Sequence, residues 1–202
     1  MDSTNCERRY LGAGVTASVK SVKVVVLGPF AVGKTSFVGA VSEIRPASTE
    51  ERMTAAGALV DDLRGLDHKG TTTVALDFGR VTVTHDIVLY LFGAPGQPRF
   101  ASLITDLMAG ALGGVVLADT KRISEPWNAM ERLEEAGLPY VVVVNAFPDS
   151  PRYSDAELYQ VLDLDPDTPL VTCDVRRRES AKTVLIALVS HLLSRPSLEP
   201  VL

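Results

Sequence analysis

The residues with the clearest chemical potential lie in one short stretch, GPFAVGKTS at residues 28–36. It matches the pattern G-x-x-x-x-G-K-[ST], in which glycines let backbone amides curl around phosphate oxygens. Lys34 would add a positive charge beside those phosphates, and the Thr35 hydroxyl could bind Mg²⁺. The pattern predicts a loop that holds the phosphates of a nucleotide. A glycine-bearing turn with a surface lysine is the competing interpretation.

The segments on either side of the loop favour the first interpretation. The apolar run at residues 22–27 precedes it, as expected of a buried strand, and Phe37, Val41 and Ile44 follow at helical spacing. A strand before and a helix after are the setting in which this pattern binds phosphate, because the amino end of a helix is partially positive. We therefore expect the phosphate contacts to come from Gly28, Ala31, Val32, Gly33, Lys34, Thr35 and Ser36.

Strand-like and helix-like segments alternate along the chain. Continuous apolar runs, typical of strands buried on both faces, lie at residues 22–27, 114–118, 140–145 and 170–173. Helical spacing, with capping or stop residues at its ends, lies at residues 127–137, 154–162 and 181–195. The alternation predicts an α/β fold, a three-layer sandwich with a sheet between helices. The pattern at residues 28–36 places this fold in the P-loop NTPase class.

One pair of strands is expected to run in opposite directions. Residues 74–84 and 87–92 are strand-like and are joined only by His85 and Asp86, which predicts an antiparallel hairpin. The predicted sheet is therefore mostly parallel, with six strands of which one is antiparallel. We expect one domain over residues 21–195, with an N-terminal tail at 1–20 and a C-terminal tail at 196–202.

Composition excludes several classes of function. The chain of 202 residues has a formal net charge of −5, so no basic surface for nucleic acid is expected. Cys6 and Cys173 have no metal-ligand spacing and fit a reducing compartment, so we expect a cytoplasmic protein. No segment approaches the roughly 20 apolar residues of a membrane-spanning helix. Any membrane contact would therefore be made through a partner.

Four segments, KVVVLGPFAVGKTSF, TTTVALDFG, LYLFGAPGQPRF and VVVVNAF, occur in an order that resembles a Ras-type small GTPase. The resemblance covers about residues 21–194 and is greatest to the bacterial MglA-like branch and the conservon GTPases of actinobacteria. It implies a small GTPase-like fold, binding of GTP or GDP with Mg²⁺, and hydrolysis of GTP. It also implies protein regulators and effectors, among them a roadblock-type activator and a sensor kinase-like protein.

The resemblance assigns roles to two further segments. Thr73 would bind Mg²⁺ together with Thr35 and contact the γ-phosphate, although Thr71 or Thr72 could replace it, and a threonine-rich strand without that role is another interpretation. Gly96 would donate its amide to the γ-phosphate.

Gln97 would orient the attacking water, so Gln97, Lys34 and Thr73 are the expected catalytic residues. A Pro-Gly turn with an exposed glutamine is the alternative for this segment.

The sequence departs from the resembled family at two places. Gly93 stands where an aspartate usually supports Mg²⁺ through water. The N-K-x-D element that reads guanine is replaced by NAFPD, in which the lysine is absent and Asp149 comes one residue late. Either Asp149 reaches the base or Asn145 and backbone groups read it with less discrimination. Cys173 and Asp174 could donate backbone amides to the guanine carbonyl, or they could form an ordinary strand-end turn.

The connection over residues 45–73 is long enough to have structure or function of its own. Residues 48–51 resemble a capping box, and apolar residues at helical spacing follow up to Gly65, which predicts an extra helix. No arginine directly precedes Thr73, and Arg64, Lys69 and Arg99 are interpreted as solvated surface charges. Hydrolysis is therefore expected to be slow without an activating partner.

Three functions remain open from the sequence. The leading one is a GTP-hydrolysing molecular switch. The second is a nucleotide-loaded scaffold that does not hydrolyse, which Gly93 and the altered base loop favour. The third is an ATP-dependent small-molecule phosphotransferase, because kinases share the phosphate loop, although no arginine-rich lid segment is present.

Overall fold

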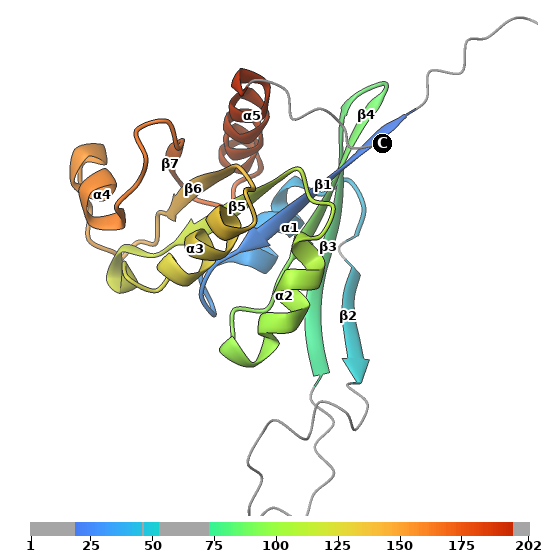
Figure 1. Cartoon of the computed structure of the whole chain (residues 1–202), viewed down its shortest axis with the longest axis horizontal. Coiled ribbons are helices and arrows are strands. Elements are labelled where there is room, and N and C mark those ends of the chain that lie inside the picture. Colours follow the sequence, from blue (N-terminus) through green and yellow to red (C-terminus); the bar gives the residue numbers. More distant parts are fainter. Residues whose placement is uncertain (1–18, 46, 53–72, 196–202) are drawn as a thin grey trace, which may run out of the picture.

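The structure is a computed structural model that describes residues 19–45, 47–52 and 73–195. A seven-stranded sheet in the order β2-β3-β4-β1-β5-β6-β7 forms its centre, with helices on both faces (Figure 1). The strands are β1 Lys20–Leu27, β2 Ala47–Arg52, β3 Thr73–Thr84, β4 Ile87–Gly93, β5 Gly113–Ala118, β6 Tyr140–Asn145 and β7 Leu170–Cys173. The helices are α1 Lys34–Val41, α2 Ala101–Met108, α3 Trp127–Glu135, α4 Asp155–Leu162 and α5 Arg178–Ser194, and the 3₁₀ turns are η2 Pro98–Phe100 and η3 Thr120–Arg122.

Two separate hydrophobic cores explain why the central strands are apolar at every position. In β1, Val24 and Val26 belong to the core that α1 and α5 cover, whereas Val25 and Leu27 belong to the core on the side of α2 and α3. Successive side chains of a strand point to opposite faces, so a strand covered on both sides needs apolar residues throughout. The predicted three-layer α/β fold is confirmed.

The predicted hairpin and the four predicted helices, which correspond to α1, α3, α4 and α5, are also confirmed. β3 and β4 pair antiparallel, while β1 pairs parallel with both β4 and β5, and β6 pairs parallel with β5 and β7. At the start of α4, the Ser154 hydroxyl accepts a hydrogen bond from the Glu157 amide, and the Glu157 side chain accepts one from the Ser154 amide. This is the capping box that the sequence predicted.

The sheet contains one strand more than predicted. β2 lies where residues 48–51 were interpreted as a helix cap, and that interpretation is wrong: these residues pair antiparallel with β3, from Ala47 opposite Phe78 to Arg52 opposite Thr73. The edge of β3 offers unpaired backbone groups, and pairing with them outweighs a local preference for a helix start. The rest of the predicted extra helix lies outside the described residues, as do the tails apart from residues 19 and 20.

The direction of the strands decides where a site can form. The carboxyl ends of β1, β4, β5, β6 and β7 lie at the same edge of the sheet, because these strands are mutually parallel. In open α/β sheets, ligands bind outside this edge. Among the described helices, none is both long and apolar enough to cross a bilayer.

Candidate functional site

The loop between β1 and α1 curls tightly, and close contacts require its two glycines. Gly28 and Gly33 have φ angles of 136° and 110°, which residues with side chains disfavour. A Cβ atom at Gly28 would lie 2.5 Å from the carbonyl oxygen of Leu117, and one at Gly33 would lie 2.8 Å from Nδ2 of Asn145. The glycines of the sequence pattern therefore let the backbone pass close to β5 and β6.

The curled loop contains a series of backbone amides that have no hydrogen-bond acceptor among the described residues. Among the described residues, none accepts a hydrogen bond from the amides of residues 30–36, whereas the Phe37 amide donates to the Gly33 carbonyl oxygen at 2.8 Å. Free amides at the start of a helix form a natural anion site, to which the helix dipole adds. The predicted phosphate-binding residues thus lie together, in one loop and the first turn of α1.

Lys34 begins α1 and is buried against this loop. Its Nζ donates hydrogen bonds to the carbonyl oxygens of Gly28 at 2.9 Å and Pro29 at 2.6 Å. Burial lowers the pKa of the Lys34 ammonium from 10.5 to about 8, the negative charge of Asp77 opposes this effect, and the positive charge of Arg122 adds to it. A buried cation of this kind is stabilised by a bound anion, as a phosphate site requires.

A cavity of about 360 Å³ opens beside the loop and gathers residues from three segments. Lys34 and Thr35 line it from α1, Gly96 and Gln97 from the loop after β4, and Asp77 from β3. Its volume lies in the range of small-molecule sites. The structure thus brings together seven of the predicted site residues from two parts of the chain about 60 positions apart: Ala31, Gly33, Lys34, Thr35 and Ser36, and Gly96 and Gln97.

Arg99 also lines this cavity, which the sequence interpretation of a solvated surface charge did not foresee. Its guanidinium carbon lies 4.9 Å from the centre of the Phe100 ring, and Arg99 is exposed. An arginine at this place adds positive charge to the wall of the cavity that Gln97 shares.

Asp77 is a site residue that the sequence interpretation missed. Its buried carboxylate accepts a hydrogen bond from the Thr35 hydroxyl at 2.6 Å. Asp77 lies opposite Gly93 in the pairing of β3 with β4, and a Cβ atom at Gly93 would lie 2.9 Å from the Asp77 Cβ. The Asp77 side chain of β3 therefore fills the space that a side chain at position 93 of β4 would occupy. The register of the predicted hairpin is the signal that could have identified this carboxylate.

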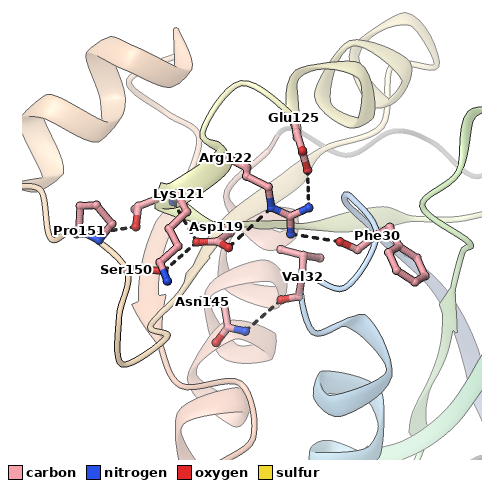
Figure 2. A network of polar contacts seen from close by, with 10 residues as sticks. Phe30, Val32, Asp119, Lys121, Arg122, Glu125, Asn145, Ser150 and Pro151 are labelled. Carbon is pink, nitrogen blue, oxygen red and sulfur yellow. Dashed lines mark hydrogen bonds and ion pairs between the residues drawn. The ribbon is translucent and has the colours of Figure 1, made fainter.

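Asn145, at the end of β6, is buried and connects three segments, and Figure 2 shows its bond to Val32 in the loop after β1. Its Nδ2 donates to the Val32 carbonyl oxygen at 2.9 Å, and its Oδ1 accepts from the Val175 amide at 3.3 Å. Both ends of the amide are thus engaged within the protein. Asn145 holds the phosphate loop, and its predicted contact with a base stays a prediction.

The other predicted base-reading residues lie where β6 and β7 end: Asp149 and Asp174 lie on the loops that follow these two strands, and Cys173 is the last residue of β7. Asp149 is exposed on the first. On the second, Arg176 forms two 2.9 Å hydrogen bonds with the Asp174 carboxylate and lowers its pKa to about 2. Burial raises the pKa of the neighbouring Cys173 thiol to about 11, and Asp174 adds to the rise. Cys173 therefore stays a neutral thiol at physiological pH.

The family of the chain agrees with this geometry. The sequence model of a family described as "Conserved hypothetical ATP binding protein" matches residues 26–195, which include the whole loop of residues 28–36. The chain belongs to this ATP-binding family. Membership supports the P-loop fold and nucleotide binding. Among curated proteins, none matches the chain.

Several more specific expectations about this member of the ATP-binding family stay predictions. Thr73 begins β3, opposite Arg52 of β2, and its role toward Mg²⁺ is a prediction. The same holds for the choice of guanine, the hydrolysis of GTP and the resemblance to the MglA-like branch.

Proposed function

We propose that the chain is a nucleotide-dependent switch that binds GTP with Mg²⁺ and hydrolyses it to GDP and phosphate. One observation carries the proposal: the cavity beside the phosphate loop joins Lys34 and Thr35 to Gln97 and Asp77. Groups suited to binding phosphate and a group suited to orienting water therefore share one space.

The phosphate loop supplies the binding energy for the proposed ligand. The free amides of residues 30–36 would contact the phosphate oxygens, and the Lys34 ammonium would neutralise part of their charge. Gly28 and Pro29 keep Nζ in place through their carbonyl oxygens before a ligand arrives. Preorganisation of this kind lowers the cost of binding.

The oxygen groups beside Lys34 suit Mg²⁺, which prefers oxygen ligands and keeps several waters. The Thr35 hydroxyl would bind the ion directly, and Asp77 would accept hydrogen bonds from its waters in place of an aspartate at position 93. Thr73 is the proposed additional ligand from β3. The ion, when bound, neutralises charge on the phosphates that the reaction cleaves.

Gln97 is the proposed orienting group for hydrolysis. It would hold a water in line with the γ-phosphorus, so that the new bond to the water oxygen forms as the bond to the β-phosphate oxygen breaks. Gly96 packs on the phosphate loop so closely that a Cβ atom there would lie 2.6 Å from the Phe30 nitrogen. The loop with Gln97 would therefore respond to a γ-phosphate, and protein regulators and effectors would read that response. We expect slow hydrolysis until a partner completes the site.

The identity of the base is the second part of the proposal. Guanine is favoured by the resemblance of the four motif segments, whereas the description of the family favours ATP. Asp149 and the backbone of residues 173–174 would contact the base. An ATP-binding protein is therefore the second candidate, and one titration separates the two.

The deciding experiment titrates the purified chain with fluorescent GTP, GDP, ATP and ADP in the presence of Mg²⁺. We expect tighter binding of the guanine nucleotides and a loss of at least 100-fold in affinity for Lys34→Ala. Lys23→Gln, which removes a lysine outside the phosphate cavity, is the matched control and should bind normally. Preferential binding of ATP would replace GTP in the proposal, and normal binding by Lys34→Ala would refute the site.

Single-turnover release of phosphate tests the hydrolytic part. Gln97→Leu should bind nucleotide with unchanged affinity and release phosphate at least tenfold more slowly than the wild type. Equal rates near background in both proteins would instead support a nucleotide-loaded scaffold.

A further inference from the structure

The outer side of the phosphate loop is held by an arginine that none of the steps above uses. Arg122, the last residue of η3, donates from Nη2 to the carbonyl oxygen of Phe30 at 3.1 Å (Figure 2). Its Nη1 lies 3.0 Å from the Glu125 carboxylate, and its Nε lies 3.9 Å from the Asp119 carboxylate. One planar guanidinium therefore contacts the Phe30 carbonyl oxygen and the Glu125 carboxylate and lies within ion-pair distance of Asp119. Lysine lacks the planar fork that reaches in these directions at once.

The anchor of this arginine is buried. Asp119 follows β5 with a side chain that is only 9% exposed, and it caps η3 by accepting the Lys121 amide at 3.0 Å. It also accepts the Ser150 hydroxyl at 2.8 Å, from the loop that follows β6. Thr120 donates to the Pro151 carbonyl oxygen at 2.7 Å in the same region. The turn that carries Arg122 is thus fixed to the loop that would contact a base.

The bond to Phe30 has a consequence inside the phosphate loop. A peptide group is planar and trans, so the Phe30 carbonyl and the Ala31 amide point in opposite directions. Holding the carbonyl outward toward Arg122 therefore aims the Ala31 amide toward the opposite side of the loop. Among the described residues, none accepts a hydrogen bond from that amide.

Ala31 needs such a constraint because its backbone is strained. Its φ angle is 62°, in the left-handed region that residues other than glycine rarely occupy. Such a conformation persists only where the surroundings impose it. Arg122 on one side and the closely packed Gly96 beside Phe30 on the other supply that constraint.

We propose that Arg122 is a positioning residue that locks the Phe30–Ala31 peptide, so that the Ala31 amide is directed at the β- or γ-phosphate of the bound nucleotide. The inference rests on the proposed binding of a nucleoside di- or triphosphate. Asp119 and Ser150 keep the guanidinium in place. Arg122 acts through the peptide and does not touch the nucleotide.

Arg122 could also strengthen nucleotide binding by its charge alone, because a cation near the loop attracts phosphate whatever the orientation of the Phe30–Ala31 peptide. The first experiment measures the dissociation constant for GDP with Mg²⁺ and the ³¹P resonance of the bound β-phosphate in Arg122→Ala. We expect about tenfold weaker binding and a shifted β-phosphate resonance. Arg132→Ala is the control: it removes a half-buried arginine of α3 that bonds to Asn128, and it should change neither quantity.

Two further variants decide between positioning and charge. Arg122→Lys keeps the charge but lacks the planar fork that contacts Phe30 and Glu125 beside Asp119. It should therefore show most of the loss of GDP affinity seen in Arg122→Ala, together with the shifted β-phosphate resonance. Ser150→Ala frees Asp119 and should move the resonance in the same direction by a smaller amount. Full recovery in Arg122→Lys, or wild-type binding by Arg122→Ala, would overturn the inference. Absence of nucleotide binding by the wild type would refute the proposed function instead.

Discussion

Lys34 shows how a single buried charge can make ligand binding depend on pH. The residue is only 8% exposed, and burial lowers the pKa of its ammonium to about 8. A phosphate beside Nζ would stabilise the protonated form and raise that pKa. Below pH 8 the group is already charged, so binding is unaffected. Above pH 8 the empty protein must take up a proton to bind, so affinity falls as the pH rises.

We therefore predict that the dissociation constant for GDP with Mg²⁺ rises about tenfold between pH 7 and pH 9, as expected for one group of pKa 8. Isothermal titration in buffers of different ionisation enthalpy would measure both the affinity and the proton uptake. Lys23→Gln should retain the full pH dependence. A flat profile with no proton uptake at pH 9 would contradict the low pKa of Lys34.

Asp77 and Gly93 make a second prediction, because only one of the two positions has room for a carboxylate. Mg²⁺ should increase the nucleotide affinity of Asp77→Gly at least tenfold less than it increases that of the wild type, because Thr35 would lack its acidic partner. Gly93→Asp alone should destabilise the fold, because the added Cβ would meet the Asp77 Cβ at 2.9 Å.

The double variant Asp77→Gly/Gly93→Asp moves the carboxylate to the other strand of the same register pair. We expect it to recover part of the Mg²⁺ dependence, measured as the ratio of dissociation constants with and without the ion. No difference between Asp77→Gly and the wild type in that ratio would exclude Asp77 from the ion site.

At the scale of helices, strands and loops, the sequence predicted the elements that form through interactions between neighbouring residues. The strand before the phosphate loop, the loop itself and the capping box at Ser154 could all be identified from neighbouring residues. β2 could not, because its pairing with β3 depends on an edge that residues far along the chain create. The same reason hid the contact between Arg122 and Phe30, which are 92 positions apart.

Asn145 makes the connection between elements testable. Its side chain joins the phosphate loop at Val32, the end of β6 and the turn before α5 at Val175. Asn145→Ala would leave a buried carbonyl and a buried amide without these partners, at a cost of about 2 kcal/mol in the free energy of unfolding. Urea denaturation without nucleotide would measure it.

Asn128→Ala is the matched control, because this exposed asparagine bonds only to the Arg132 side chain among the described contacts. Its effect should stay within about 0.5 kcal/mol. Equal stability of Asn145→Ala and the wild type would show that the three segments hold together without this amide.

In the molecule as a whole, the site lies where loops from both sides of the sheet meet. The phosphate loop belongs to β1 and α1, Gln97 follows β4, and Asn145 ends β6. Each of these strands contributes to the two hydrophobic cores. A ligand that contacts all these loops therefore stabilises the folded chain and not the unfolded one.

The thermal unfolding of the chain should report this linkage directly. Nucleotide at 100 times its dissociation constant adds about 2.7 kcal/mol to the free energy of unfolding. For a domain of this size that corresponds to a rise of about 5–10 °C in the midpoint of thermal unfolding. Differential scanning fluorimetry with GDP and with ADP, each with Mg²⁺, would measure it, and the nucleotide that binds more tightly should give the larger rise at equal concentration. Lys34→Ala should unfold at the same temperature with and without nucleotide, because it lacks the ammonium that binds phosphate. A rise in Lys34→Ala equal to that of the wild type would place the stabilising nucleotide outside the loop of residues 28–36.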